Sequence, residues 1–163
     1  PNKPGRSDDA GIVKIGAAVA GGKLRAWILD DASGRGKPSE WRDTAARLAL
    51  TAPAAGAVVV ESSGLGEHAE LTIKGSPLWD DYPIAVYEVQ ARLGKKDRAR
   101  PVWQLYLDGR VTHVGQLPYL ERQMTTWEPD NDPISPGALD AMVHGITHLL
   151  IDVRGAPNVG RGR

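Results

Sequence analysis

The feature that most constrains the fold of this chain is an early pair of strand-like segments, followed by helix-like and strand-like segments in alternation. Residues 11–31, GIVKIGAAVAGGKLRAWILDD, place aliphatic and β-branched runs on both sides of Gly21-Gly22, a pair that favours a tight hairpin turn. The later segments extend this to the expected order ββαβαβα(β)αα. That order predicts an α/β fold, a mixed sheet flanked by helices, rather than a sandwich or a bundle.

Helix-capping residues, prolines and the spacing of apolar residues predict where the individual helices and strands begin and end. SEWRDTAARLAL predicts a helix over 39–50 with Ser39 as N-cap, ending before Pro53. AGAVVVESS contains a continuous apolar run, typical of a strand covered on both faces, which ends at Glu61. The remaining expected segments are a helix in EHAELTIKG, a strand in PIAVYEV, a helix in DRARPVWQLYLDGR, a short strand in VTHVG, a helix in PYLERQMTTW, and a last helix from about Pro136 to about Val153 with Ser135 as N-cap.

Composition excludes several classes of protein. The 163 residues, 41% of them apolar, fit one compact domain with its own core. Because 20 basic side chains balance 20 acidic ones, any affinity for nucleic acid must come from a local patch. The absence of cysteine rules out disulfides, thiolate metal sites and a cysteine nucleophile. No apolar run approaches the roughly 20 residues that span a bilayer, so we expect a soluble protein with no membrane partner.

Two acids are candidate metal ligands. Asp140 lies about 100° round the last helix from Leu139, at the edge of the apolar stripe formed by Leu139, Met142, Val143, Ile146, Leu149, Leu150 and Val153. Glu61 directly follows a buried strand, at the end where open sheets place their ligands. Together the two carboxylates would bind one or two Mg²⁺ or Mn²⁺ ions. The alternatives are a solvated strand end for Glu61 and, for Asp140, stabilisation by the helix dipole, worth about 0.3–1 kcal/mol.

A local excess of positive charge is the third feature. In ARLGKKDRARP, five basic residues face a single acid, Asp97; they are Arg92, Lys95, Lys96, Arg98 and Arg100. Such a cluster neutralises phosphates without reading base sequence. A solvated loop and helix start is the equally good alternative. Residues 154–163, RGAPNVGRGR, are basic and Gly-rich, which predicts a flexible tail that either contacts nucleic acid or is simply solvated.

Four stretches resemble, in order, the carboxy-terminal nuclease domain of the large terminase subunit of tailed bacteriophages and prophages. They are SDDAGIVKIGAAVAGGKLRAWILDDASGRGKPSEW, AGAVVVESSGLGE, ARLGKKDRARPVWQLYLDGRVTHVGQLPYLERQMTTWEP and SPGALDAMVHGITHL, and they cover nearly the whole chain. The most specific parts are LYLDGRVTHVG, LERQMTTW and SPGALDAMVHGITHL.

The resemblance implies a ribonuclease H-like fold over residues 1–153 and a metal-dependent endonuclease that cuts concatemeric viral DNA during genome packaging. By this similarity Glu61 and Asp140 are catalytic metal ligands of two Mg²⁺ or Mn²⁺ ions. Asp8 is a further catalytic acid, and Asp9 is its less certain neighbour. His144 would lie near the metal, although a histidine on a helix surface is the ordinary explanation. The double-stranded DNA would be held through its backbone by Lys95, Lys96, Arg98, Arg100 and Arg110.

The chain departs from the family pattern at its start. Family members begin this domain with a strand that ends in a catalytic Asp, whereas this chain opens at PNKPGRSDD, so we expect a domain lacking its first strand because preceding residues are omitted. There is no G-x-x-x-x-G-K-[ST] loop, so the packaging ATPase is expected elsewhere in the same polypeptide. The resemblance further implies the portal and the small terminase subunit as partners, and the host cytoplasm, during virion assembly, as the location.

Two alternatives stay open. Another ribonuclease H-like enzyme, such as a junction resolvase or a transposase core, would use the same acids on branched or end-specific DNA. A non-catalytic docking domain of the packaging motor would bind no metal tightly and cut nothing, and the missing first acid keeps this reading open.

Overall fold

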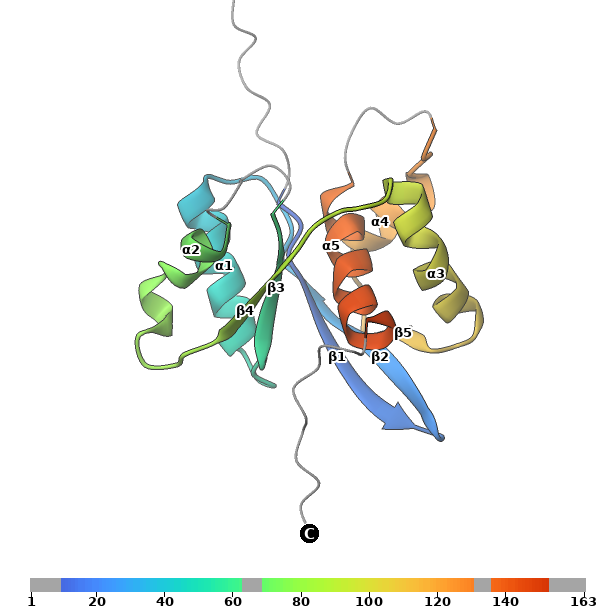
Figure 1. The fold of residues 1–163 in the computed structure, drawn as a ribbon, viewed down its shortest axis with the longest axis horizontal. Helices are drawn as coiled ribbons and strands as arrows, with labels where there is room; N and C mark the ends of the chain where they lie inside the picture. The colour runs from blue at the N-terminus through green and yellow to red at the C-terminus, as the bar shows by residue number, and fades with distance from the viewer. Residues whose placement is uncertain (1–9, 63–68, 131–135, 153–163) are drawn as a thin grey trace, which may run out of the picture.

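The computed structural model describes residues 10–62, 69–130 and 136–152 (Figure 1). The expected order of strands and helices is confirmed over these residues. The strands are β1 (Val13–Ala20), β2 (Lys23–Asp31), β3 (Ala57–Glu61), β4 (Ala85–Val89) and β5 (Val111–His113). The helices are α1 (Pro38–Leu50), α2 (Ala69–Lys74), α3 (Lys95–Leu107), α4 (Pro118–Thr126) and α5 (Gly137–Ile146), with a short 3₁₀ turn η2 (Pro77–Trp79) and a π-helical extension of α5, η3 (Thr147–Ile151).

The strands form a mixed three-stranded sheet and a parallel pair. β1 and β2 are antiparallel and join at Gly21 and Gly22, whose φ angles of 61° and 73° are the positive values that this two-residue turn requires. β5 adds to β2 in parallel, which gives the order β1-β2-β5. β3 and β4 form the parallel pair, in which Glu61 lies opposite Val89. Helices pack on both groups of strands, so the chain has an α/β fold.

Two hydrophobic clusters hold these elements together. The larger one joins β2, β5, α3, α4 and α5, and its fully buried members include Ile28, Leu120, Met142 and Ile146. The smaller one joins α1, α2 and η2 to β3 and β4 around Ala46, Ala49, Ile73 and Trp79. Helix α5 belongs to the larger cluster and also contacts β1 and β3, so it links the two groups of strands (Figure 1).

Two helix starts differ from expectation. Ser39 is not the N-cap of α1: Lys37 occupies that position, because Pro38 lacks an N–H and suits the first helical residue. Glu40 closes the cap by accepting a hydrogen bond from the Lys37 N–H at 2.8 Å. Helix α5 begins at Gly137 with Pro136 as N-cap, and Ser135, the expected cap, lies outside the described residues. Helix α1 ends at Leu50, before Pro53, as predicted.

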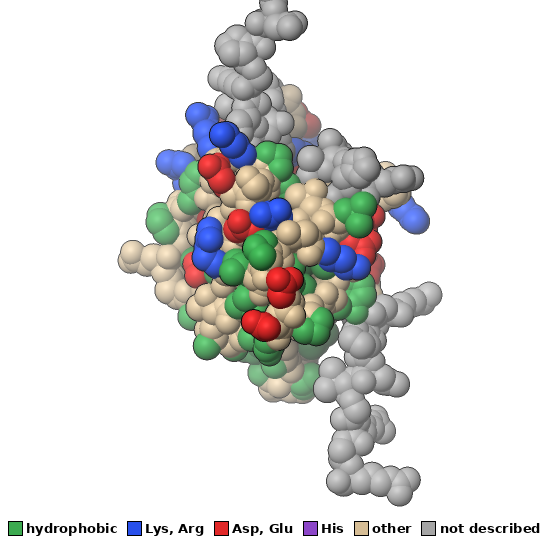
Figure 2. All heavy atoms as spheres, turned by 90° about the vertical axis from the view of Figure 1, so that its left-hand side faces the viewer, with side chains coloured by type: hydrophobic (Ala, Val, Ile, Leu, Met, Phe, Trp, Pro, Cys, Tyr) green, Lys and Arg blue, Asp and Glu red, His purple; other side chains and the backbone are tan. Residues whose placement is uncertain are grey.

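Some expectations fall on residues outside the described ranges. These are Asp8, Asp9, Val153 and the tail 154–163. Over the described ranges, no helix combines the length and the apolar character needed to cross a membrane. On the face formed by α1 and α2, basic and acidic side chains are interspersed, in keeping with a net charge of zero (Figure 2).

Candidate metal centre

Glu61 and Asp140, 79 positions apart in the sequence, come together in the structure, and His144 joins them. Glu61 is the last residue of β3, and α5, which contacts β3, carries Asp140 in its first turn and His144 one turn later. One ligand atom from each of the three residues lies within 4.8 Å of the other two. The expected convergence of the two acids is therefore observed, whereas their role as metal ligands stays a prediction.

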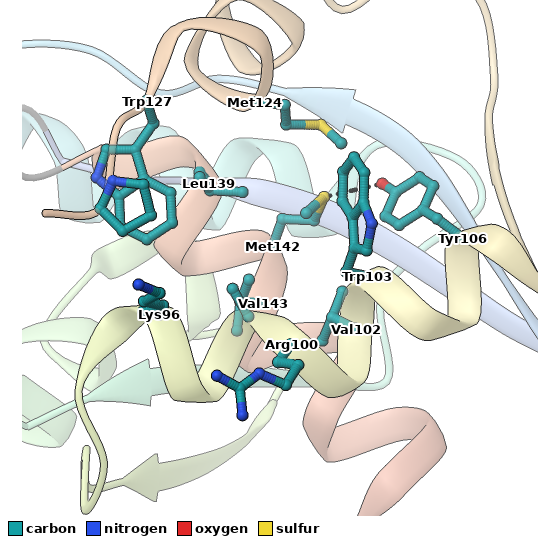
Figure 3. Close-up of a pocket in the computed structure, with 12 residues that line it drawn as sticks. Lys96, Arg100, Val102, Trp103, Tyr106, Met124, Trp127, Leu139, Met142 and Val143 are labelled. Carbon is teal, nitrogen blue, oxygen red and sulfur yellow. Dashed lines mark hydrogen bonds between the residues drawn. The ribbon is translucent and has the colours of Figure 1, made fainter.

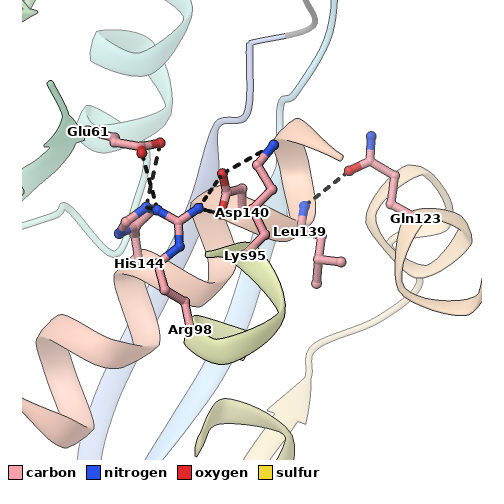
Figure 4. Close-up of polar contacts among 7 residues, drawn as sticks. All are labelled: Glu61, Lys95, Arg98, Gln123, Leu139, Asp140 and His144. Atoms are coloured by element: carbon pink, nitrogen blue, oxygen red, sulfur yellow. Dashed lines mark hydrogen bonds and ion pairs between the residues drawn. The ribbon is translucent and has the colours of Figure 1, made fainter. Parts of the chain in front are cut away.

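Two backbone hydrogen bonds hold the first turn of α5, one at Leu139 and one at Asp140. Gln123 of α4 accepts a hydrogen bond from the Leu139 N–H at 3.1 Å, which satisfies one of the free donors at the helix start (Figure 4). The Asp140 N–H donates to Pro136 O at 2.9 Å. Because Asp140 lies in the first turn, its negative charge also interacts favourably with the helix dipole. The position of this carboxylate is thus set by backbone contacts.

A guanidinium group occupies the space between the three side chains (Figure 4). Arg98, in the first turns of α3, places Nη1 3.2 Å from Glu61 Oε1 and 3.0 Å from His144 Nε2. Its Nη2 donates to both carboxylate oxygens of Asp140, at 2.9 and 3.2 Å. Lys95 adds a second cation, with Nζ 3.9 Å from Asp140 Oδ2. Among the described residues, two positive charges therefore face two carboxylates at this site.

Arg98 also contacts His144. An arginine side chain only donates hydrogen bonds, so His144 Nε2 is the acceptor in this contact. The same nitrogen lies 3.5 Å from Glu61 Oε2. Neutral imidazole nitrogen is the form that binds metals.

The donor set fits one hard divalent ion. Two carboxylates supply the oxygen ligands that Mg²⁺ and Mn²⁺ prefer, and an imidazole nitrogen is better suited to Mn²⁺ than to Mg²⁺. The side chains of Asp140 and His144 are each 13% exposed and that of Glu61 is 27% exposed, so an ion there would be partly shielded from solvent. A second ion needs a further carboxylate, and Asp8, the expected third acid, lies outside the described residues.

The remaining basic residues of α3 point away from the acids or pair with other ones. Lys96 Nζ is 2.8 Å from a carboxylate oxygen of Asp130, and the Arg100 guanidinium is 3.6 Å from Asp97. The Lys96 and Arg100 side chains are 54% and 73% exposed, so both are open to a phosphate. Both line the side of α3 opposite to Arg98, whereas Lys95 contacts Asp140.

Arg110 lies apart from these basic residues. It follows the far end of α3, a helix of 13 residues that spans about 20 Å at 1.5 Å per residue. Its Nε donates to the carbonyl oxygen of Leu24 at 2.9 Å, which ties β2 to the start of β5. The family resemblance grouped Arg110 with the basic residues of α3, but the length of the helix separates them. Its role in DNA binding stays a prediction.

A second polar cluster was not expected from the sequence. His113 lies between Tyr106 and Glu121, with Nε2 2.7 Å from the Tyr106 hydroxyl and Nδ1 3.0 Å from Glu121 Oε1. Burial raises the pKa of the Tyr106 phenol well above its ordinary value. The hydrogen bond from His113 lowers the pKa of Glu121. The three residues come from α3, β5 and α4, so no single sequence motif joins them.

An apolar pocket of about 260 Å³ lies between α3, α4 and α5 (Figure 3). Trp103, Tyr106, Met124 and Trp127 provide much of its wall, and Lys96 and Arg100 line it too. The opposite side of α3 carries Arg98 into the acid cluster.

No protein-family model, curated protein or solved structure matches this chain. The resemblance to terminase nuclease domains therefore continues as a proposal, to be judged on the contacts described above.

Proposed function

We propose that this chain is a divalent-metal-dependent DNA endonuclease with a ribonuclease H-like fold, the nuclease part of a terminase large subunit. The single observation that carries the proposal is the convergence of Glu61, Asp140 and His144 within 4.8 Å, at the end of a parallel strand and the start of a helix. The α/β order, with a hairpin before the parallel pair, supports the fold assignment.

Each side chain has a definite part in this chemistry. A bound Mg²⁺ or Mn²⁺ ion would polarise the scissile phosphodiester and lower the pKa of a coordinated water. Glu61 and Asp140 supply carboxylate oxygens from a strand and a helix, and His144 presents Nε2 beside them. Lys95, at the rim of the site, neutralises phosphate charge. These contacts involve only the DNA backbone, so cleavage would show little sequence preference.

Plasmid nicking in Mn²⁺ tests the proposal. We expect Glu61→Gln and Asp140→Asn each to reduce the nicking rate at least about 100-fold, because removing one carboxylate removes charge and a ligand from the site. Asp130→Asn is the matched control: its side chain is 74% exposed and contacts Lys96 outside the site, so the rate should stay within a factor of two or three. Nicking that survives both site substitutions would exclude this site.

One observation favours a different function. Arg98 contacts both acids and neutralises their charge, as it would in a purely structural ion cluster. A non-catalytic docking domain of the packaging motor would need nothing more from these residues. That alternative predicts no Mn²⁺ binding dependent on Glu61, and calorimetric titration of Mn²⁺ into wild type and Glu61→Gln separates the two. A junction resolvase or transposase core would share the acids and is separated by comparing branched, linear and supercoiled DNA.

A further inference from the structure

We propose that Arg98 is an internal competitor for the metal, and that DNA phosphate draws it out of the site, so that metal and DNA bind cooperatively. This inference rests on the proposed function and adds a regulatory step to it. The basis is that the guanidinium contacts all three candidate ligands, Glu61 at 3.2 Å, His144 at 3.0 Å and Asp140 at 2.9 Å.

Arg98 and a metal ion need the same lone pairs. The hydrogen bond to His144 uses the Nε2 lone pair, and the fork at Asp140 engages both carboxylate oxygens. Coordination by a divalent ion requires those atoms free of hydrogen-bond donors, and a second positive charge at the same point repels the first. The two cations therefore exclude one another, and metal binding includes the displacement of the guanidinium.

The displacement requires only a side-chain movement. The backbone of Arg98 is fixed in α3, where its N–H donates to Gly94 O at 3.1 Å. Its Nε is buried and, among the described residues, has no hydrogen-bond partner. Moving the side chain outward lets Nε reach water or a phosphate, which offsets part of the lost contacts. The long, flexible arginine stem allows this without moving the helix.

Duplex DNA supplies the group that takes the guanidinium in exchange. Phosphate accepts two parallel hydrogen bonds from an arginine fork, as a carboxylate does. Lys95, whose Nζ lies 3.9 Å from Asp140 Oδ2, adds a positive charge that attracts a phosphate backbone to the site. The exposed Lys96 and Arg100 add charge on the other side of the same helix. When Arg98 turns to the phosphate, the two carboxylates and His144 become available to the ion. Each ligand then strengthens the binding of the other by the same factor.

Mn²⁺ binding to the protein alone is the first measurement. Electron paramagnetic resonance of free Mn²⁺ gives the dissociation constants for wild type, Arg98→Gln and a matched control on the same helix, Arg100→Gln. We expect Arg98→Gln to bind Mn²⁺ about tenfold more tightly than wild type, within the 5–150-fold range of typical couplings. Arg100→Gln should bind as wild type does, since Arg100 is 73% exposed and pairs with the surface acid Asp97 rather than with a candidate ligand.

The coupling to DNA is the second measurement. A 30-base-pair duplex, with the Mn²⁺ bound by the duplex alone subtracted, should tighten Mn²⁺ binding to wild type about tenfold. It should leave Arg98→Gln nearly unchanged, because the competitor is already gone. Cleavage during the measurement does not matter, since a nicked duplex keeps its phosphates.

A purely structural role for Arg98 gives a different result. Without metal, Arg98→Gln should lower the melting temperature, because two carboxylates lose their counter-ion. Adding Mn²⁺ should restore the melting temperature of the variant. A structural role alone predicts the lower melting temperature but no tighter binding of Mn²⁺. Should Arg98→Gln fail to fold, Arg98→Lys keeps the charge but cannot reach all three ligands, and it should still bind Mn²⁺ more tightly than wild type.

The outcomes separate this inference from the proposed function. Glu61-dependent Mn²⁺ binding that is equal in wild type, Arg98→Gln and Arg98→Lys would overturn the inference and leave the endonuclease standing. Absence of Glu61-dependent Mn²⁺ binding in all three proteins would overturn the inference as well. Nicking that survives Glu61→Gln and Asp140→Asn, or Mn²⁺ binding that does not depend on Glu61, removes the proposed function itself.

Discussion

Gly11, directly before β1, touches the start of α5 so closely that a side chain has no room there. A Cβ atom on Gly11 would lie 1.9 Å from the carbonyl oxygen of Gly137 and 2.4 Å from its carbonyl carbon. Both are backbone atoms, and contacts under 3.0 Å essentially never occur for real Cβ atoms, so the two segments must separate by about 1 Å. Gly11→Ala therefore pushes β1 away from α5.

The expected cost follows from that displacement. Overpacking a well-packed contact costs typically about 1–3 kcal/mol, and a clash with rigid backbone belongs in the upper half of that range. We expect Gly11→Ala to lower the free energy of unfolding by about 2–3 kcal/mol, which for a chain of this size lowers Tm by roughly 4–12 °C. Since the first turn of α5 also carries Asp140, Mn²⁺ affinity should fall as well.

Urea denaturation followed by circular dichroism measures the effect against a matched control. Gly56 is exposed, and a Cβ there would meet nothing within 4 Å. Neither glycine has a positive φ, so alanine suits both backbones, and Gly56→Ala should be neutral or more stable by about 0.4–1 kcal/mol. If Gly11→Ala were as stable as Gly56→Ala, the close approach of β1 and α5 would be refuted.

Three further substitutions test other parts of the fold. Lys14→Met should cost about 1.5–3 kcal/mol in urea denaturation, because the buried ammonium donates to two carbonyls at the end of α1. Trp79→Phe should cost about 1–3 kcal/mol by the same assay, since it leaves the carbonyl of Ile73 without the indole N–H that lies 2.7 Å away. Because the pKa of Glu121 is lowered in the folded state, this carboxylate stabilises the fold above its unfolded pKa of about 4.3, and the stabilisation is lost as the pH falls through the folded pKa. Glu121→Gln keeps a hydrogen-bond partner for His113 but does not titrate. In this variant the free energy of unfolding should therefore depend less on pH below about pH 4.5.

The parts of the fold that depend on local chemistry were predictable. Gly21-Gly22 specified the hairpin because only glycine adopts two consecutive positive φ angles at low cost. The apolar stripe on the last helix placed Asp140 beside the core, and its side chain is indeed 13% exposed. The continuous apolar run before Glu61 predicted a strand at this place, and β3 pairs with β4 and contacts α2 and α5, although its residues are half-buried rather than fully covered.

The parts that depend on packing between distant elements were not predictable. Arg98 was read as one of several outward-facing cations, because the sequence does not show how α3 is rotated against α5. Once the two helices pack, the fourth residue of α3 faces Asp140, while Arg100 points to solvent. The contact of His113 with Glu121 was missed for a related reason, since it depends on how α4 folds back beside β5 after the short loop between them. The cap at Lys37 was missed because Pro38 shifts the helix start.

The candidate metal centre lies where two separately packed interiors meet. Glu61 ends a strand of the smaller cluster, whereas Asp140, His144 and Arg98 are held by helices of the larger one. The distances between the candidate ligands therefore depend on how the two hydrophobic clusters are positioned relative to each other. A core substitution in either cluster, far from any ligand atom, would then weaken binding of the proposed ion before it caused measurable unfolding.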